Sequence, residues 1–200
     1  LELSLLLSIP AAAGLVIASY DIVNALFGYG SFEKKDVLKT SEALKYFGYG
    51  IPAFALVKVL SNLFFARGNT KTPFYISVII VFLNVSVSLA FFNKIGFLII
   101  PIATTLSTWI GTFIYFGILA KKKFYETRGN STANILKIIL STTIMSIFLL
   151  IALNYFSSNL DYSNTYKIFY LMFIVIFSAI VYIVTSYLLG ILNLKNYRTF

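Results

Sequence analysis

The chain has 200 residues, of which 59% are hydrophobic, 18% are aromatic and only 12% are charged. A soluble domain of this size cannot bury so much apolar surface, so the composition excludes an ordinary water-soluble fold. Cysteine and histidine are both absent, which excludes disulfides, thiolate or zinc-thiolate chemistry and histidine acid–base catalysis within these residues. The basic residues that give the net charge of +9 lie in the segments between apolar stretches, so no nucleic-acid partner is expected.

Six long apolar stretches follow one another along the chain. A membrane-spanning helix needs about 20 mostly apolar residues, because only a helix satisfies its own backbone polar groups across about 30 Å of hydrocarbon. The sequence therefore predicts an all-α, polytopic transmembrane helix bundle. Its six membrane spans are expected at about 3–27, 43–65, 74–92, 96–119, 135–156 and 168–192. The chain begins at Leu1 without a signal-peptide pattern, and we expect it to lack an N-terminal part.

Two features stand out in the first two predicted spans. Pro10 and Pro52, like Pro101 in the fourth span, lie inside apolar stretches, where a proline bends a helix or frees a carbonyl group. Lys58 is the one charge deep inside a span. A lysine at a helix centre costs about 2.5–3.5 kcal/mol on insertion scales, so Lys58 is expected either to face a water-filled cavity or to snorkel to the headgroups.

The junction between the second and third spans reads as a helix end followed by a helix start. Gly68 and Asn69 tolerate the left-handed conformation that ends helices. Thr72 is expected to cap the next helix, and a proline in the following position suits a first turn. Arg67 and Lys71 lie where cations favour the end of the first helix and an anionic lipid surface. Taken alone, the motif is also compatible with a simple turn.

Basic residues predict the orientation of the chain. They gather in the connections 66–73 and 120–134 and in the tail, whereas 28–42 mixes both signs and the other loops hold chiefly Lys94 and Lys167. Because short loops rich in lysine and arginine stay in the cytoplasm, the first span should run from inside to outside. The C-terminus is then cytoplasmic.

Several motifs resemble those of the MurJ/MviN lipid II flippases. They are residues 26–32, Pro52-Ala53, residues 57–60 and residues 65–73, and the match covers about residues 8–108. The resemblance implies the C-terminal part, six of fourteen helices, of a two-bundle transporter in the multidrug/oligosaccharidyl-lipid/polysaccharide exporter superfamily, with the N-terminal bundle missing. The last two spans match only in length and position. Tyr20-Asp21 departs from the acid–proline pair often found there.

A flippase of this kind implies transport rather than an enzymatic activity. It would move undecaprenyl-pyrophosphate-linked peptidoglycan precursor across a bacterial inner membrane by alternating access, with membrane lipid, lipid II and its own N-terminal half as partners. The candidates for substrate or cavity contacts are Lys58, Arg67 and Lys71. The family's cavity arginines belong to upstream helices, and its last two helices are thought to form a groove for the lipid tail.

Small polar residues in the third and fourth spans have two interpretations. The default is interhelical hydrogen bonding, which contributes about 0.6 kcal/mol per bond in membranes. The resemblance adds a candidate sodium site, because some family members hold sodium at positions that match Asn84, Ser88, the Ile100 carbonyl and Thr104. Ser88 stands where a carboxylate would strengthen such a site, which argues against sodium. No cofactor is otherwise expected, and coupling to sodium or to the membrane potential stays open.

Other function classes are weaker. Another polysaccharide-lipid or drug exporter of the same superfamily is the first alternative. A polytopic glycosyltransferase or phosphotransferase acting on polyprenyl carriers would need acids to bind Mg²⁺, and the seven acids here are scattered. A membrane scaffold without transport is the third reading, and arginines in the upstream helices would argue against it.

Overall fold

The computed structural model describes residues 1–121 and 131–191 of the chain. The described part is helical and contains no strand, which confirms the all-α prediction. Its elements are α1 (Glu2–Ile17), α2 (Ser19–Phe27), α3 (Lys34–Phe65), α4 (Lys71–Ile95), a short 3₁₀ turn η1 (Gly96–Leu98), α5 (Ile99–Lys121), α6 (Ser131–Tyr155) and α7 (Lys167–Leu188). The basic residues predicted to lie in the connection and the tail at 122–130 and 192–200 fall outside the described residues.

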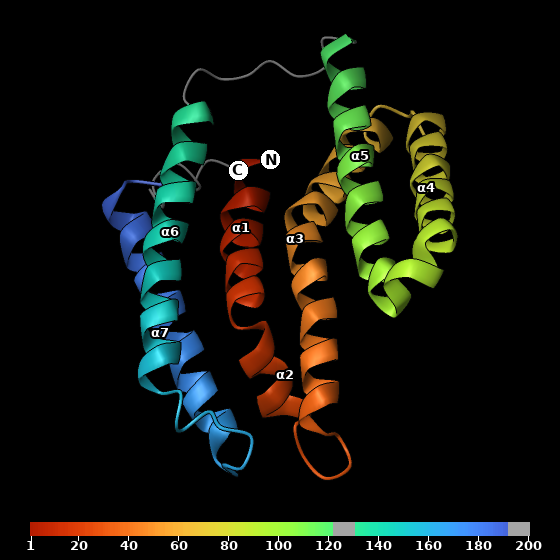
Figure 1. Cartoon of the computed structure of the whole chain (residues 1–200). Coiled ribbons are helices and arrows are strands. Elements are labelled where there is room, and N and C mark those ends of the chain that lie inside the picture. Colours follow the sequence, from red (N-terminus) through yellow and green to blue (C-terminus); the bar gives the residue numbers. More distant parts are fainter. Residues whose placement is uncertain (122–130, 192–200) are drawn as a thin grey trace.

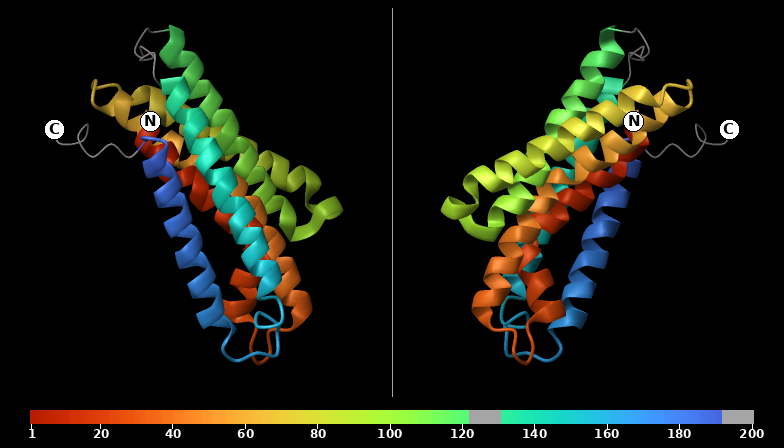
Figure 2. Two further views of the ribbon diagram at one scale, coloured as in Figure 1. Left: turned by 90° about the vertical axis from the view of Figure 1, so that its left-hand side faces the viewer. Right: turned by 90° about the vertical axis from the view of Figure 1, so that its right-hand side faces the viewer.

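The helices pack in a row. In Figure 1, α6 and α7 lie on one side, α1 and α2 in the middle, then α3, and α5 and α4 on the other side. Chain order and spatial order differ, because the last two helices return to pack against the first one. Figure 2 shows the same row edge-on, with the α4–α5 pair inclined to α7.

The first predicted span is two helices rather than one. α1 and α2 meet at Ala18 with a bend of 71°. Pro10 lies inside α1, and the helix continues through it to Ile17, so the break at Ala18 does not coincide with the proline. The break places α2 against α3 and α7, where Ala18 and Ala25 are each 1% exposed.

The second predicted span begins earlier than expected. α3 starts at Lys34, not at residue 43, and has 32 residues, about 48 Å at 1.5 Å per residue. A capping box starts it: Glu33 accepts from the N–H of Asp36, and the Asp36 carboxylate accepts from the N–H of Glu33. The predicted loop 28–42 is therefore wrong in extent, because its charged second half is the first part of α3.

Four helical segments are long and apolar enough to cross a membrane, and the bent α1–α2 pair would be a fifth. One of the four, Lys71–Lys121, contains two of the predicted spans. It folds back at η1, so that α4 and α5 lie side by side (Figure 1). Gly96 at this turn has φ 71°, which favours glycine. Each of the six predicted spans thus contains helix, and the number of membrane crossings stays a prediction.

Small residues allow α3 to approach its neighbours closely. A Cβ atom at Gly48 would lie 2.7 Å from Val16 of α1, and one at Gly50 would lie 2.8 Å from Thr105 of α5. Glycine at such positions is typical of membrane helix pairs, which associate through tight packing. α3 is therefore held between α1 and α5, and it joins the two sides of the bundle.

Candidate functional site

The α3–α4 turn is built as the sequence indicates, with one difference. Gly68 has φ 69°, and N–H groups of Asn69 and Gly68 donate to the carbonyls of Phe64 and Phe65, at 3.0 and 2.9 Å, in the pattern of a Schellman cap. The N-cap residue of α4 is Thr70, and the side chain that satisfies a first-turn N–H group is that of Asn69, so the prediction that Thr72 caps the helix is wrong. The Asn69 side chain accepts from the Thr72 N–H and donates to its hydroxyl.

The three predicted cations lie at one end of the bundle but do not form one cluster. Arg67 belongs to the α3–α4 turn, and Lys71 is the first residue of α4. Lys58 is on α3, seven residues before its end, about 10 Å along the axis. It is exposed, on the side of α3 away from Leu56 and Leu60, two of the buried residues of this helix. Its side chain has no hydrogen bond or ion pair with the described residues, so both predicted roles of Lys58 stay open.

The candidate sodium residues do come together. Asn84 Nδ2 on α4 donates to Thr104 Oγ1 on α5 at 2.9 Å, and Thr104 Oγ1 donates to the Ile100 carbonyl at 2.7 Å. Ser88 Oγ donates to Asn84 Oδ1 at 3.3 Å. These groups hydrogen-bond one another, carry no negative charge, and turn the Asn84 amide N–H toward Thr104. As they stand they fit an interhelical hydrogen-bond network better than a sodium site.

A second set of hydrogen bonds joins α5 to α3. Thr105 and Trp109 of α5 donate to the backbone carbonyls of Tyr46 and Tyr49, at 2.8 and 3.0 Å. One turn further, Thr112 is fully buried and lies 3.4 Å from the Ala53 carbonyl. The polar residues of the fourth predicted span therefore act as interhelical contacts, as the default interpretation expects.

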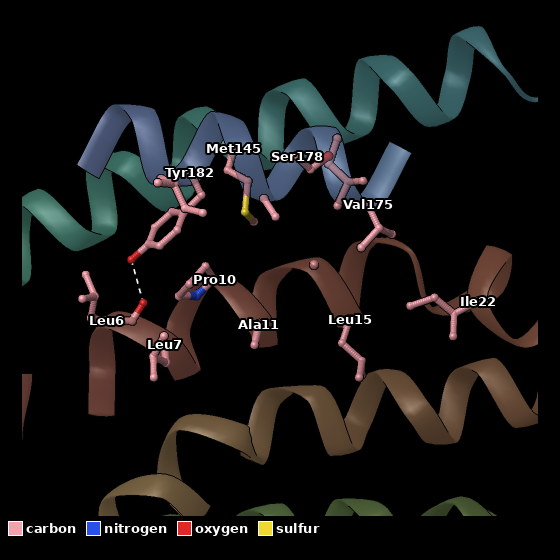
Figure 3. A pocket seen from close by; sticks show the side chains of 14 residues that line it. Leu6, Leu7, Pro10, Ala11, Leu15, Ile22, Met145, Val175, Ser178 and Tyr182 are labelled. Carbon is pink, nitrogen blue, oxygen red and sulfur yellow. Dashed lines mark hydrogen bonds between the residues drawn. The ribbon is translucent and has the colours of Figure 1, made fainter. Parts of the chain in front are cut away.

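An apolar pocket of about 490 Å³ lies between α1, α6 and α7. Figure 3 shows side chains from these helices converging on it. They are almost entirely aliphatic and include Leu6, Pro10, Met145, Val175 and Tyr182. The pocket can accommodate hydrocarbon and offers little to a polar group.

Pro10 and Tyr182 fix one end of this pocket. A proline has no N–H to donate to the carbonyl four residues earlier, so Pro10 leaves the Leu6 carbonyl without its usual helical partner. The Tyr182 hydroxyl of α7 donates to that carbonyl at 2.7 Å (Figure 3). The prediction that a proline frees a carbonyl is confirmed here, and the tyrosine that uses it was not foreseen.

Lys167 forms a buried contact at the opposite end of α7. The sequence places it in a loop, but it is the first residue of α7 and is fully buried. Its ammonium donates to the carbonyls of Gly28 and Tyr162, at 2.8 and 2.9 Å, and to Asn24 Oδ1 at 3.3 Å. The rings of Tyr29 and Tyr162 lie 4.2 and 4.8 Å from it. No carboxylate contacts it among the described residues, so carbonyl dipoles and aromatic faces hold the charge at the negative end of α2.

The loops at this end contact one another as well. The Tyr162 hydroxyl donates to the Phe32 carbonyl at 2.6 Å, and Lys34 lies 3.9 Å from Asp161. Both members of that ion pair are largely exposed, so it contributes little. A hydrogen bond from Ser163 lowers the pKa of the Asp161 carboxyl group. The α2–α3 and α6–α7 loops therefore lie on the same side of the bundle.

Comparison with known proteins gives one consistent result. The family model "Lipid II flippase MurJ" matches residues 1–171. The chain is 30% identical over 198 residues to the probable lipid II flippase MurJ of Rickettsia prowazekii, covering 98% of this chain and 39% of that protein. It is 29% identical over 193 residues to the corresponding protein of Thermotoga maritima, covering 96% and 37%.

A solved structure agrees with the sequence comparison. The lipid II flippase MurJ in an inward closed conformation superposes with a TM-score of 0.73 at 26% identity, covering 91% of this chain and 36% of that one. The chain therefore spans little more than a third of the length of the relatives that it matches.

Proposed function

The chain belongs to the MurJ family of lipid II flippases, and from that premise we propose that it supplies the C-terminal helix bundle of a transporter that moves lipid II from the cytoplasmic to the outer leaflet of a bacterial inner membrane. The match over residues 1–171, with its similarity to a solved flippase, carries this proposal. The chain is a multi-pass membrane protein by family and by its apolar helices. The relatives' remaining length would supply the other wall of the cavity.

The apolar pocket between α1, α6 and α7 is where the polyprenyl tail would lie. The tail can stay in a hydrocarbon-like site while the charged headgroup crosses through a polar path. The protein then needs to provide a polar environment for the headgroup only. The aliphatic lining of the pocket supports this role. The Tyr182–Leu6 hydrogen bond satisfies the one freed backbone carbonyl there, so that the lining offers no unpaired polar group to the tail.

Lys58 is the residue that would meet the pyrophosphate. It lies on an uncovered side of α3 within the membrane-spanning length, and a cation at that depth needs water or an anion beside it. Arg67 and Lys71 would act at the membrane surface on the same side. The proposal includes no sodium-dependent step, because Asn84 and Thr104 form a hydrogen bond with each other.

Lys58 variants test this assignment in a strain depleted of its own flippase. Lys58→Ala is expected to lower lipid II translocation without lowering the amount of protein in the membrane, and Lys58→Arg to retain more activity than alanine. Lys45→Ala is the matched control, because Lys45 is also an exposed lysine of α3 but lies nearer its start. Normal growth with Lys58→Ala would show that Lys58 only snorkels.

A second experiment tests the two-bundle proposal. Residues 1–200 alone should insert into the membrane, because each helix satisfies its own backbone, and should not flip lipid II. Co-expression with the upstream part of a relative should restore activity. Complementation by the 200-residue chain alone would contradict the proposal and indicate a self-contained transporter.

A further inference from the structure

A second cavity, of about 560 Å³, lies outside the apolar pocket, between the end of α3 and the beginning of α4. Its apolar side is formed by Val57 and Phe65 of α3 and by Phe74 of α4. Its polar side is formed by Lys71 and Tyr75 of α4, and by hydroxyl groups of nearby serine and threonine residues. The cavity therefore combines a hydrocarbon-like wall with a cation and several hydrogen-bond donors.

Tyr115 of α5 closes the cavity from inside the bundle. Its side chain is 1% exposed and packs against the Phe64 ring, with ring centroids 5.7 Å apart. Its hydroxyl has no hydrogen-bond partner among the described residues. The side chain is buried as a whole but belongs to the lining of the cavity, so a ligand atom or a water molecule there can accept the hydrogen bond of the hydroxyl. Tyr115 is thus a second feature, independent of the α4 terminus, that indicates an occupant.

The position of the cavity along α4 matches the depth of lipid phosphates. Lys71 and Lys94 lie near opposite ends of this helix, about 34 Å apart at 1.5 Å per residue. This slightly exceeds the hydrocarbon thickness of about 30 Å, so each lysine reaches one headgroup layer. The Lys71 end also carries the positive end of the α4 helix dipole, which favours an anion. A ligand here is expected to carry its charge at the surface and its chains in the membrane.

We propose that the α3–α4 cavity binds an anionic phospholipid of the adjacent leaflet, with its phosphate beside Lys71 and the Tyr115 hydroxyl donating to its headgroup. One acyl chain would lie along Val57 and Phe74. Charge complementarity selects this occupant over a zwitterionic lipid. The site goes beyond the proposed transport of lipid II, because its occupant is a membrane phospholipid and it lies apart from the apolar pocket. On α3 its lining residues Ser61 and Phe65 share the helix face of Lys58.

The test uses tryptophan fluorescence, since the chain has a single tryptophan. In a Trp109→Phe background, Phe74→Trp places the reporter at the cavity, where Phe74 is 64% exposed. The protein is reconstituted in nanodiscs containing doxyl-labelled phosphatidylglycerol or doxyl-labelled phosphatidylcholine. Leu89→Trp, further along α4 and 74% exposed, reports on ordinary lipid contact.

Phosphatidylglycerol should be preferred roughly fivefold at Phe74→Trp, the effect expected for one lysine near an anionic surface, and not at Leu89→Trp. Lys71→Gln should abolish the preference. Tyr115→Phe should instead weaken the binding of both lipids about threefold, as expected for one hydrogen bond to the phosphate that both carry. Lys94→Gln, the matched control at the other end of α4, should leave the preference unchanged. These variants leave the helix caps intact, and circular dichroism checks that each one is folded.

Several results would overturn the proposal. Equal quenching by both lipids, or an equal loss in Lys71→Gln and Lys94→Gln, would show only a general surface attraction. No quenching by either lipid would mean that a protein segment fills the cavity. Complete competition by inorganic phosphate at millimolar concentration would identify a free-phosphate site instead of a lipid site.

Discussion

Lys167 allows a quantitative test of how the bundle is held together. Its fully buried ammonium joins the end of α2 to the α6–α7 loop and the start of α7. Lys167→Met keeps a flexible side chain of similar length and removes the charge and its three donors. The carbonyls of Gly28 and Tyr162 then lose their only hydrogen bonds among the described residues.

The expected loss of stability follows from these two carbonyls. A buried acceptor left without a donor costs about 1–3 kcal/mol, so two of them cost about 2–6 kcal/mol. The methionine variant no longer has to desolvate an ammonium, which returns part of this cost. We expect a net loss of about 2–3 kcal/mol, near the upper range of ordinary point mutations. For a chain of this size that lowers the Tm by about 4–12 °C.

The assay is unfolding of the purified protein in mixed micelles, followed by circular dichroism. Lys94→Met is the matched control, because Lys94 is an exposed lysine at the end of α4 and should change stability by less than about 0.5 kcal/mol. If Lys167→Met unfolds together with the parent and the control, the ammonium does not hold α2 to α7, and the reasoning fails.

Three further predictions concern orientation, the apolar pocket and the polar network. Single cysteines at Ser31 and at Thr70 should differ on whole cells: an impermeant thiol reagent should label the first and spare the second, and the reverse result would invert the orientation. Tyr182→Phe should lower the free energy of unfolding by about 1 kcal/mol, within the range measured for membrane hydrogen bonds, and an unchanged value would mean that water replaces the hydroxyl. Replacing Na⁺ by K⁺ should leave the Tm of the protein unchanged, because Asn84 and Thr104 form a hydrogen bond with each other. If Na⁺ raises the Tm, K⁺ does not, and Asn84→Ala removes the effect, the residues form a cation site.

The sequence predicts the features of this protein that depend on neighbouring residues. Apolar length is a local property, and each predicted span contains a helix for that reason. The left-handed Gly68 and the helix end before it are also local, because a Schellman cap needs only six consecutive residues. The early start of α3 is local too, but its capping box lies among charged residues that the hydropathy pattern assigns to a loop.

Contacts between distant segments depend on the tertiary structure. Hydropathy alone does not show that Lys167 is buried and donates hydrogen bonds to Asn24 and Gly28, because those partners are 143 and 139 residues away in the sequence. From the sequence, one can infer only that the polar residues of two adjacent helices pair with each other. The geometry of the Asn84–Thr104 contact is needed to decide between hydrogen bonding and cation binding.

The pocket shows the same division. The sequence by itself determined that Pro10 frees a carbonyl, since a proline ring has no N–H wherever the helix packs. Only the tertiary structure decided that Tyr182, 176 residues further along the chain, reaches that carbonyl. A helical repeat tells which residues share a face, but not which other helix will cover that face, and that choice depends on the packing of the whole bundle.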